Sequence, residues 1–143
     1  MRFMLVTSPR RTAESPGPPD PRLMAAIDRL CDELTRTGVL LETGGMGPST
    51  RMRLGGGELR IVDGPYAESK EVVGGYAVVQ VGSFEEAVEL TQRFLGLHRE
   101  ILGPAYECDN EIRRLYGPWD QQATSDSAAD PLPHTSVCPA LFD

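Results

Sequence analysis

The segment from Tyr76 to Val81 constrains the fold most, because every position in it except Gln80 is apolar. In an extended strand, successive side chains point to opposite faces of the sheet. Tyr76 and Val78 would therefore share one face, and the other face would carry Ala77, Val79 and Val81. A strand that is apolar on both faces is typical of the centre of a sheet with a covering layer on each side. Each of the two faces therefore needs a covering layer.

One amphipathic helix is predicted after the first strand. Asp20 followed by Pro21 is typical of a helix N-cap and its first helical position. Apolar residues then recur at helical spacing, at Leu23, Ile27, Leu30, Cys31 and Leu34. Gly38 is expected to end this helix.

A second amphipathic helix is predicted to begin at Ser83, which opens an S-x-x-E capping box. Its apolar face continues through Ala87, Leu90, Thr91 and Phe94. Gly96 is expected to weaken or end the helix, because glycine costs about 1 kcal/mol relative to alanine inside a helix. Residues 97–102 could add one more helical turn before Gly103 and Pro104.

Short strands are expected on either side of these helices. The first is Phe3–Thr7; a second begins at Val39–Glu42 and resumes at Thr50–Leu54; a third is Glu58–Val62, after a glycine hairpin loop; and a last strand lies between Ala105 and Tyr116. The order β-α-β-β-β-α-β reduces to the ferredoxin-like β-α-β-β-α-β arrangement with an added hairpin. The predicted fold class is therefore α+β.

The predicted helices can cover only one face of such a sheet, so the second apolar face needs another cover. We expect that cover to be the same face of a second copy. The chain should then form a homodimer whose sheets pack face to face as a dimeric α+β barrel.

Composition narrows the remaining classes of function. The chain has 143 residues and a net charge of −7, which suits one domain and argues against nucleic-acid binding. We expect the domain to occupy residues 1–117 and a Pro/Ser-rich C-terminal tail to occupy residues 118–143. No apolar run approaches the roughly 20 residues of a membrane span, and the N-terminus is not typical of a signal peptide. These features favour a cytoplasmic protein without membrane partners.

The three cysteines and two histidines have no spacing typical of a zinc site. Neither a metal nor another cofactor is expected. His98 near the end of the second helix is expected to bond helix carbonyl groups rather than act as a base, and His134 in the tail is given no role.

The candidate site lies between Arg60 and Gly75, read R-I-V-D-G-P-Y-A-E-S-K-E-V-V-G-G. Asp63 ends a strand, and Tyr66 and Lys70, the only lysine of the chain, follow within eight residues. A carboxylate base with a phenol or ammonium donor suffices for proton transfer or elimination. The alternative is structural, because Asp63-Gly64-Pro65 is also favourable turn chemistry.

The stretch V-D-G-P-Y-A-E-S-K-E-V-V-G-G-Y resembles the signature D-G-P-F-A-E-T-K-E-x-x-G-G-[FY] of the YCII-related family, in its DGPF-domain branch. Tyr66 replaces the phenylalanine and Ser69 the threonine. Further agreement at M-R-F-M-L-V, S-F-E-E-A-V-E-L and E-I-R-R-L-Y-G extends the resemblance over residues 1–117.

The resemblance implies a ferredoxin-like protomer and a dimeric α+β barrel. Many such proteins are uncharacterised, and they are often encoded beside extracytoplasmic-function sigma factors. Some relatives look like enzymes with a His-Asp pair, but this chain has no histidine in or before its first helix. A catalytic Asp63 would therefore have to work with Tyr66 or Lys70.

Two functions remain open at this point. The first is a dimeric small-ligand-binding protein with its cleft between the sheet and the Asp63–Lys70 loop, where a weak lyase or hydrolase activity would reside. The second is a non-catalytic interaction module, linked through a sigma-factor-associated partner to transcriptional control. A pocket with converging side chains favours the first function, and an exposed apolar patch favours the second.

Overall fold

The computed structural model describes residues 1–10, 19–47, 50–63 and 74–117. The predicted tail, residues 118–143, lies outside the described residues. The elements follow in the order β1 (Arg2–Pro9), α1 (Pro21–Arg36), β2 (Leu40–Gly45), β3 (Arg51–Gly55), β4 (Glu58–Asp63), β5 (Gly75–Gln80), α2 (Phe84–Leu102) and β6 (Cys108–Leu115).

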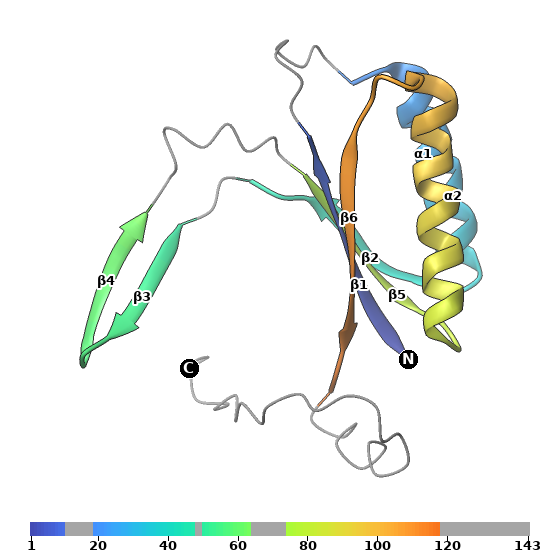
Figure 1. Cartoon of the computed structure of the whole chain (residues 1–143). Helices are drawn as coiled ribbons and strands as arrows, with labels where there is room; N and C mark the ends of the chain where they lie inside the picture. Colours follow the sequence, from blue (N-terminus) through green and yellow to red (C-terminus); the bar gives the residue numbers. More distant parts are fainter. Residues whose placement is uncertain (11–18, 48–49, 64–73, 118–143) are drawn as a thin grey trace.

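The main sheet has four strands in the order β2-β5-β1-β6, and each neighbouring pair is antiparallel. Strands β3 and β4 form a separate two-stranded sheet. Figure 1 shows α1 and α2 together on one face of the main sheet. The predicted ferredoxin-like α+β fold with an added hairpin is confirmed.

Both helices begin at the predicted caps. The Asp20 side chain accepts a hydrogen bond from the Arg22 amide at 2.8 Å, and the Ser83 hydroxyl accepts one from the Glu86 amide at 3.2 Å. The Glu86 carboxylate in turn accepts from the Gly82 amide at 2.8 Å. These bonds satisfy helix N-terminal amides that have no partner within the helix.

Of the two outcomes allowed for the second helix, the structure shows the longer one: α2 passes through Gly96, continues to Leu102 and is followed by Gly103 with φ of 82°. The propensity cost of one glycine is only about 1 kcal/mol. Packing of the last turns outweighs that cost: His98, two residues beyond Gly96, is 7% exposed.

The prediction of one interrupted strand over residues 39–54 is wrong. Strand β2 pairs with β5 in the main sheet, whereas β3 pairs only with β4 among the described strands. Residues 39–42 form a short apolar run and residues 51–54 alternate Arg with Met or Leu, so both are strand-like. The glycine-rich stretch between them separates two different sheets rather than interrupting one strand.

The core lies between the main sheet and the helices. Register pairs Phe3 with Val79 and Leu5 with Ala77, which places these side chains on the face toward the helices. Phe3 and Val79 are 2% and 1% exposed. Burial of one large apolar side chain contributes about 1.5–3 kcal/mol, so this face holds the protomer together.

Among the described residues, neither helix has an apolar run that could cross a bilayer.

The opposite face of the main sheet is also apolar at its centre. Register pairs Met4 with Val78 and Val6 with Tyr76, and all four side chains are half-buried. We call these four residues the open face. It agrees with the expected second apolar face of the central strand, while the homodimer remains a prediction.

The β3–β4 hairpin turns at Gly56 and Gly57, whose φ angles are 59° and 78°. Two positive-φ residues between the strands are typical of a type I′ turn, which glycine adopts without strain. The structure thus confirms the predicted glycine hairpin loop.

Gly74 should tolerate no side chain. A Cβ at this position would lie 2.2 Å from the backbone oxygen of Thr7, and backbone cannot move aside as a flexible side chain can. We predict that Gly74→Ala lowers the free energy of unfolding by about 1–3 kcal/mol, measured by urea denaturation. Gly47→Ala is the matched control, because a Cβ there has no neighbour within 4 Å. Equal stability of the two variants would contradict the prediction.

Candidate functional site

A cavity of about 520 Å³ lies between the helices and the main sheet. Its size falls within the range typical of small-molecule sites. The described residues that line it come from both helices and from all four strands of the main sheet, and include Leu5, Thr7, Met24, Ile27, Cys31, Leu34, Thr43, Gly45, Gly74, Gly75, Ala77, Phe94, His98, Tyr106 and Asn110.

The sheet itself explains why the cavity exists. Three successive rows of side chains across the sheet face the helices, and the rows become smaller from one end to the other. The rows are Arg114-Phe3-Val79-Leu40, then Ile112-Leu5-Ala77-Thr43, then Asn110-Thr7-Gly75-Gly45. The last row has two glycines and two small polar residues, so it leaves the space under the helices unfilled.

The described lining contains no Asp, Glu, Lys or Arg side chain. Several of its polar groups are already satisfied: the Thr43 hydroxyl donates to the Tyr76 carbonyl and the Thr91 hydroxyl to the Ala87 carbonyl, both at 2.9 Å. A charged ligand would lose its hydration here without gaining a counter-ion from these residues. The lining therefore favours an uncharged and largely apolar ligand.

Asn110 supplies a buried polar atom that has no hydrogen-bond partner in the described structure. Its Nδ2 donates to the Thr7 hydroxyl at 2.7 Å, whereas its Oδ1 is buried and has no hydrogen-bond partner in the described structure. An unsatisfied buried acceptor costs about 1–3 kcal/mol. A ligand with a hydroxyl or N–H donor would remove that cost.

His98 lies between two aromatic rings on the wall of the cavity. Its ring centroid is 4.5 Å from that of Phe94 and 5.4 Å from that of Tyr106. The Nδ1 atom is 2.9 Å from the Phe94 carbonyl. Because a carbonyl only accepts, Nδ1 must carry hydrogen, and in the neutral ring Nε2 is then an acceptor. His98 does bond a helix carbonyl as predicted. In the neutral ring its other nitrogen, Nε2, is a hydrogen-bond acceptor.

Burial favours the neutral forms of three groups at the site, Tyr106, Cys31 and Cys108. It raises the pKa of Tyr106 to about 12, with a smaller contribution from the adjacent Cys108. Burial likewise raises the pKa of the free thiols Cys31 and Cys108. At neutral pH Tyr106 is therefore a phenol donor, and neither cysteine is a thiolate nucleophile.

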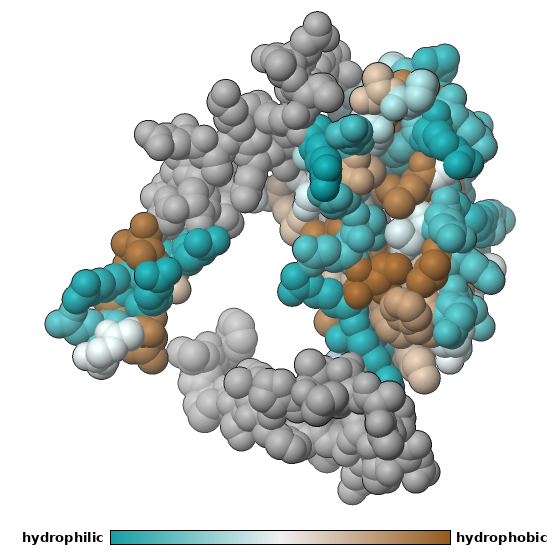
Figure 2. All heavy atoms as spheres, viewed as in Figure 1, coloured by the Kyte–Doolittle hydropathy of each residue, from teal (hydrophilic) through white to brown (hydrophobic). Residues whose placement is uncertain are grey.

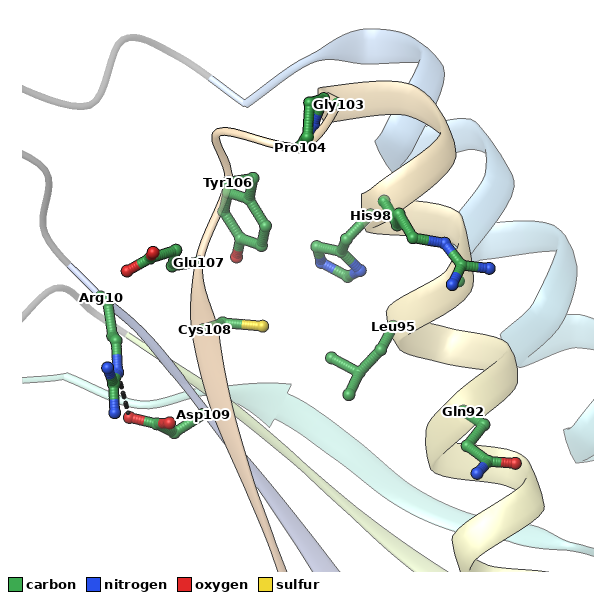
Figure 3. Close-up of a pocket in the computed structure, with 12 residues that line it drawn as sticks. Arg10, Gln92, Leu95, His98, Gly103, Pro104, Tyr106, Glu107, Cys108 and Asp109 are labelled. Atoms are coloured by element: carbon green, nitrogen blue, oxygen red, sulfur yellow. Dashed lines mark hydrogen bonds and ion pairs between the residues drawn. The ribbon is translucent and has the colours of Figure 1, made fainter.

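An open groove of about 900 Å³ lies outside the cavity, and His98 and Tyr106 line both. Figure 3 shows His98 on α2 pointing toward Tyr106 and Cys108 at the start of β6. The groove also contains charged side chains, including Arg10, which forms an exposed 2.8 Å ion pair with Asp109. The stacked pair of His98 and Tyr106 thus separates a charged groove from an uncharged interior.

The predicted site residues lie largely outside the described residues. Asp63 is the last residue of β4, where its backbone pairs with Arg51. Its side chain lies outside what the structure describes, as do Tyr66 and Lys70 entirely. Gly74, which follows residues 64–73, lines the cavity.

Thr7, Tyr106 and Asn110 are site residues that the sequence did not single out. Asn110 occupies the inward series of β6, between Cys108 and Ile112. A polar residue between Cys108 and Ile112 was the available signal, because buried polar groups require partners. Within the described ranges, no group of three His, Cys, Asp or Glu side chains could hold a metal ion.

Comparison with known proteins gives one family match. The model of the YCII-related domain matches residues 1–94, which is 94 of the 143 residues. No curated protein matches the chain. The matched segment includes α1, the five strands β1 to β5 and the first part of α2.

Tyr106 should make stability depend on alkaline pH. Its pKa is about 12 in the folded protein against the usual 10.0, so its contribution to stability is complete below pH 10 and is lost as pH rises toward 12. We predict that the difference in urea midpoint between wild type and Tyr106→Phe is constant from pH 7 to 9. Above pH 10 the wild type should lose stability faster than the variant. Parallel curves for the two proteins would refute the assignment.

Proposed function

Because this chain belongs to the YCII-related domain family, we propose that it is a small-ligand-binding protein whose site is the cavity between the helices and the sheet. It would act as a homodimer, as the two apolar faces of its central strand suggest. The proposal rests on one observation above all: the buried Oδ1 of Asn110 has no partner in a cavity of ligand size.

The chemistry of the cavity indicates the class of ligand. The hydrogen bond from Asn110 Nδ2 to Thr7 fixes the amide, so that Oδ1 offers an oriented acceptor. His98 Nε2 offers a second acceptor, and Tyr106, whose ring is stacked on that of His98, offers a phenol donor. A neutral aromatic or aliphatic alcohol, phenol or amide meets these requirements, because it carries few polar atoms and at least one donor.

The proposed function also includes three residues that would act at the edge of the cavity, namely Asp63, Tyr66 and Lys70. The support is that Gly74 lines the cavity, and the segment carrying Tyr66 and Lys70 joins the sheet there. In that arrangement Asp63 would be the base or acceptor and the other two the donors. Proton abstraction from a bound ligand, and hence a weak lyase or hydrolase activity, would then require Asp63.

The alternative function is an interaction module with a sigma-factor-associated partner. One observation favours it, namely the apolar side chains exposed on the β3–β4 hairpin. The cavity favours ligand binding more strongly, because binding through surface contacts does not require an internal cavity. The two functions are separable by mutation, because the cavity and the hairpin share no described residue.

A thermal-shift screen of wild type, Asn110→Leu and Asp63→Asn tests the proposal. We predict that neutral phenols or alcohols raise the melting temperature of the wild type by a few degrees, since a ligand at 100 times its Kd adds about 2.7 kcal/mol. Asn110→Leu, which keeps the volume but removes the acceptor, should lose this response. Matched carboxylic acids should give no shift.

Asp63→Asn separates the cavity from the loop. A response retained in Asp63→Asn and lost in Asn110→Leu places binding in the cavity without the carboxylate. Loss in Asp63→Asn with retention in Asn110→Leu would reject the cavity in favour of the loop. No response of the wild type to any neutral ligand would count against ligand binding altogether.

A further inference from the structure

His98 is a buried histidine whose neutral form is fixed by the backbone. The residue is 7% exposed, and its Nδ1 lies 2.9 Å from the Phe94 carbonyl. Because a carbonyl only accepts, the hydrogen of the neutral ring is on Nδ1 and the lone pair is on Nε2. Protonation of Nε2 would leave the existing hydrogen bond in place, since both nitrogens of an imidazolium are donors. The ring is therefore arranged as a base.

The lone pair of Nε2 is accessible to a ligand. Nε2 makes no hydrogen bond to the described residues, where the one fully enclosed side-chain nitrogen or oxygen without a partner is Asn110 Oδ1. Nε2 is therefore not sealed inside the protein. Figure 3 shows the His98 ring directed from α2 toward the start of β6. Because His98 lines the cavity, a molecule bound there can reach this atom.

Tyr106 supplies a hydrogen-bond donor beside this base. Its ring stacks on the imidazole of His98, with centroids 5.4 Å apart and planes inclined by 24°. The phenol hydroxyl interacts with the thiol of Cys108, and sulfur is a weak acceptor. A ligand oxygen can therefore take this hydrogen bond at little cost. Burial raises the pKa of Tyr106 to about 12, so the phenol keeps its proton at neutral pH.

The surroundings of the pair strengthen its electrostatic effect. Figure 2 shows apolar residues between the main sheet and the helices, and hydrophilic residues on the outer side of the helices. The described lining of the cavity has no Asp, Glu, Lys or Arg side chain. In such an interior, a donor aimed at a developing negative charge stabilises it more than it would in water. The site therefore suits a reaction that develops charge on a neutral substrate.

We propose that His98 and Tyr106 form an acid–base pair that enolises a neutral carbonyl compound bound in the cavity. His98 Nε2 removes a hydrogen from the carbon next to the carbonyl group, and Tyr106 donates a hydrogen bond to the carbonyl oxygen. This inference rests on the proposed function, because the substrate is a ligand of the cavity. It assigns the reaction to the wall of the cavity and not to Asp63, Tyr66 or Lys70.

The reaction balances without a cofactor. The C–H bond breaks, its electron pair forms a carbon–carbon double bond, and the π pair of the carbonyl group moves to the oxygen. The proton lies on Nε2 of His98, and the enolate oxygen accepts the hydrogen bond from Tyr106. His98 also lines the open groove, where this proton can exchange with water. Return of a proton to either face of the same carbon restores the ketone, so the net result is hydrogen exchange with solvent and inversion of that carbon.

Asn110 narrows the class of substrate. Its amide is held by the hydrogen bond to Thr7, so the unpaired Oδ1 is an oriented acceptor for a hydroxyl group. A neutral α-hydroxy ketone has both the hydroxyl for Asn110 and the carbonyl oxygen for Tyr106. Its activated hydrogen is on the carbon between these two groups. The substrate class is therefore the neutral α-hydroxy ketones.

Hydrogen exchange in D₂O tests the proposal on the full chain, with phenylacetylcarbinol as a neutral α-hydroxy ketone. Proton NMR measures loss of the hydrogen on the hydroxyl-bearing carbon, and chiral chromatography measures racemisation. We expect the wild type to catalyse both. The rate should fall about 100-fold or more in His98→Gln, which removes the base, and about 100-fold in Tyr106→Phe, which keeps the stacked ring. His134→Gln, the same change in the only other histidine, should keep the wild-type rate.

Chemical rescue distinguishes catalysis by His98 from a packing role. His98→Gly leaves space for a free imidazole at the position of the missing ring. Added imidazole should therefore restore part of the exchange in His98→Gly and none in Tyr106→Phe. Circular dichroism shows whether each variant keeps the fold. If the histidine variants unfold, Tyr106→Phe decides the matter, because it should bind phenylacetylcarbinol as the wild type does and exchange its hydrogen more slowly.

Thermal shift with the same ketone separates this inference from the proposed function. A ketone that raises the melting temperature of the wild type but exchanges no faster than without protein would overturn the reaction and leave ligand binding intact. Exchange that persists in His98→Gln and Tyr106→Phe but is lost in Asp63→Asn would also overturn it. If the ketone gives no shift and no exchange, the reaction and its substrate class are both rejected, while the response to neutral phenols still decides whether the cavity binds ligands.

Discussion

The antiparallel pairing of β1 with β5 is the constraint on which the rest of the structure depends. Their register sends Phe3, Leu5 and Val79 toward the helices, and the intervening residues Met4 and Val78 toward the other side. A slip of one residue would exchange the two faces and expose the core. The same pairing therefore determines which face packs against the helices, where the cavity lies beneath them and which side chains form the open face.

Site and fold are linked through the rows of the sheet. Where the inward row is Phe3 with Val79, the space is filled; where it is Thr7 with Gly75, it is not. The small residues leave a volume, and Asn110 at the end of the same row gives that volume a directed polar group. No catalytic loop is needed to create the cavity, which is why its position follows from register alone.

Periodicity and capping residues predicted most of the fold. The caps at Asp20 and Ser83 and the central β5 strand were correct, because each depends on local chemistry. The division of residues 39–54 between two sheets was not predictable, since both segments are strand-like and pairing is a property of the tertiary structure. The cavity was missed because Asn110 signals a site only once its neighbours across the sheet are known. The proposed roles of Asp63, Tyr66 and Lys70 remain predictions.

The tapering of the sheet also has a consequence for motion. Local stability follows the number of packed neighbours, so the end with Thr7, Gly45 and Gly75 should open more readily than the end with Phe3 and Val79. Amide hydrogen exchange would then be graded along β1 and β5 within a single sheet. A molecule bound in the cavity would supply the missing packing at the Thr7 end. Binding would therefore slow amide hydrogen exchange there and reduce the difference between the two ends of the strands.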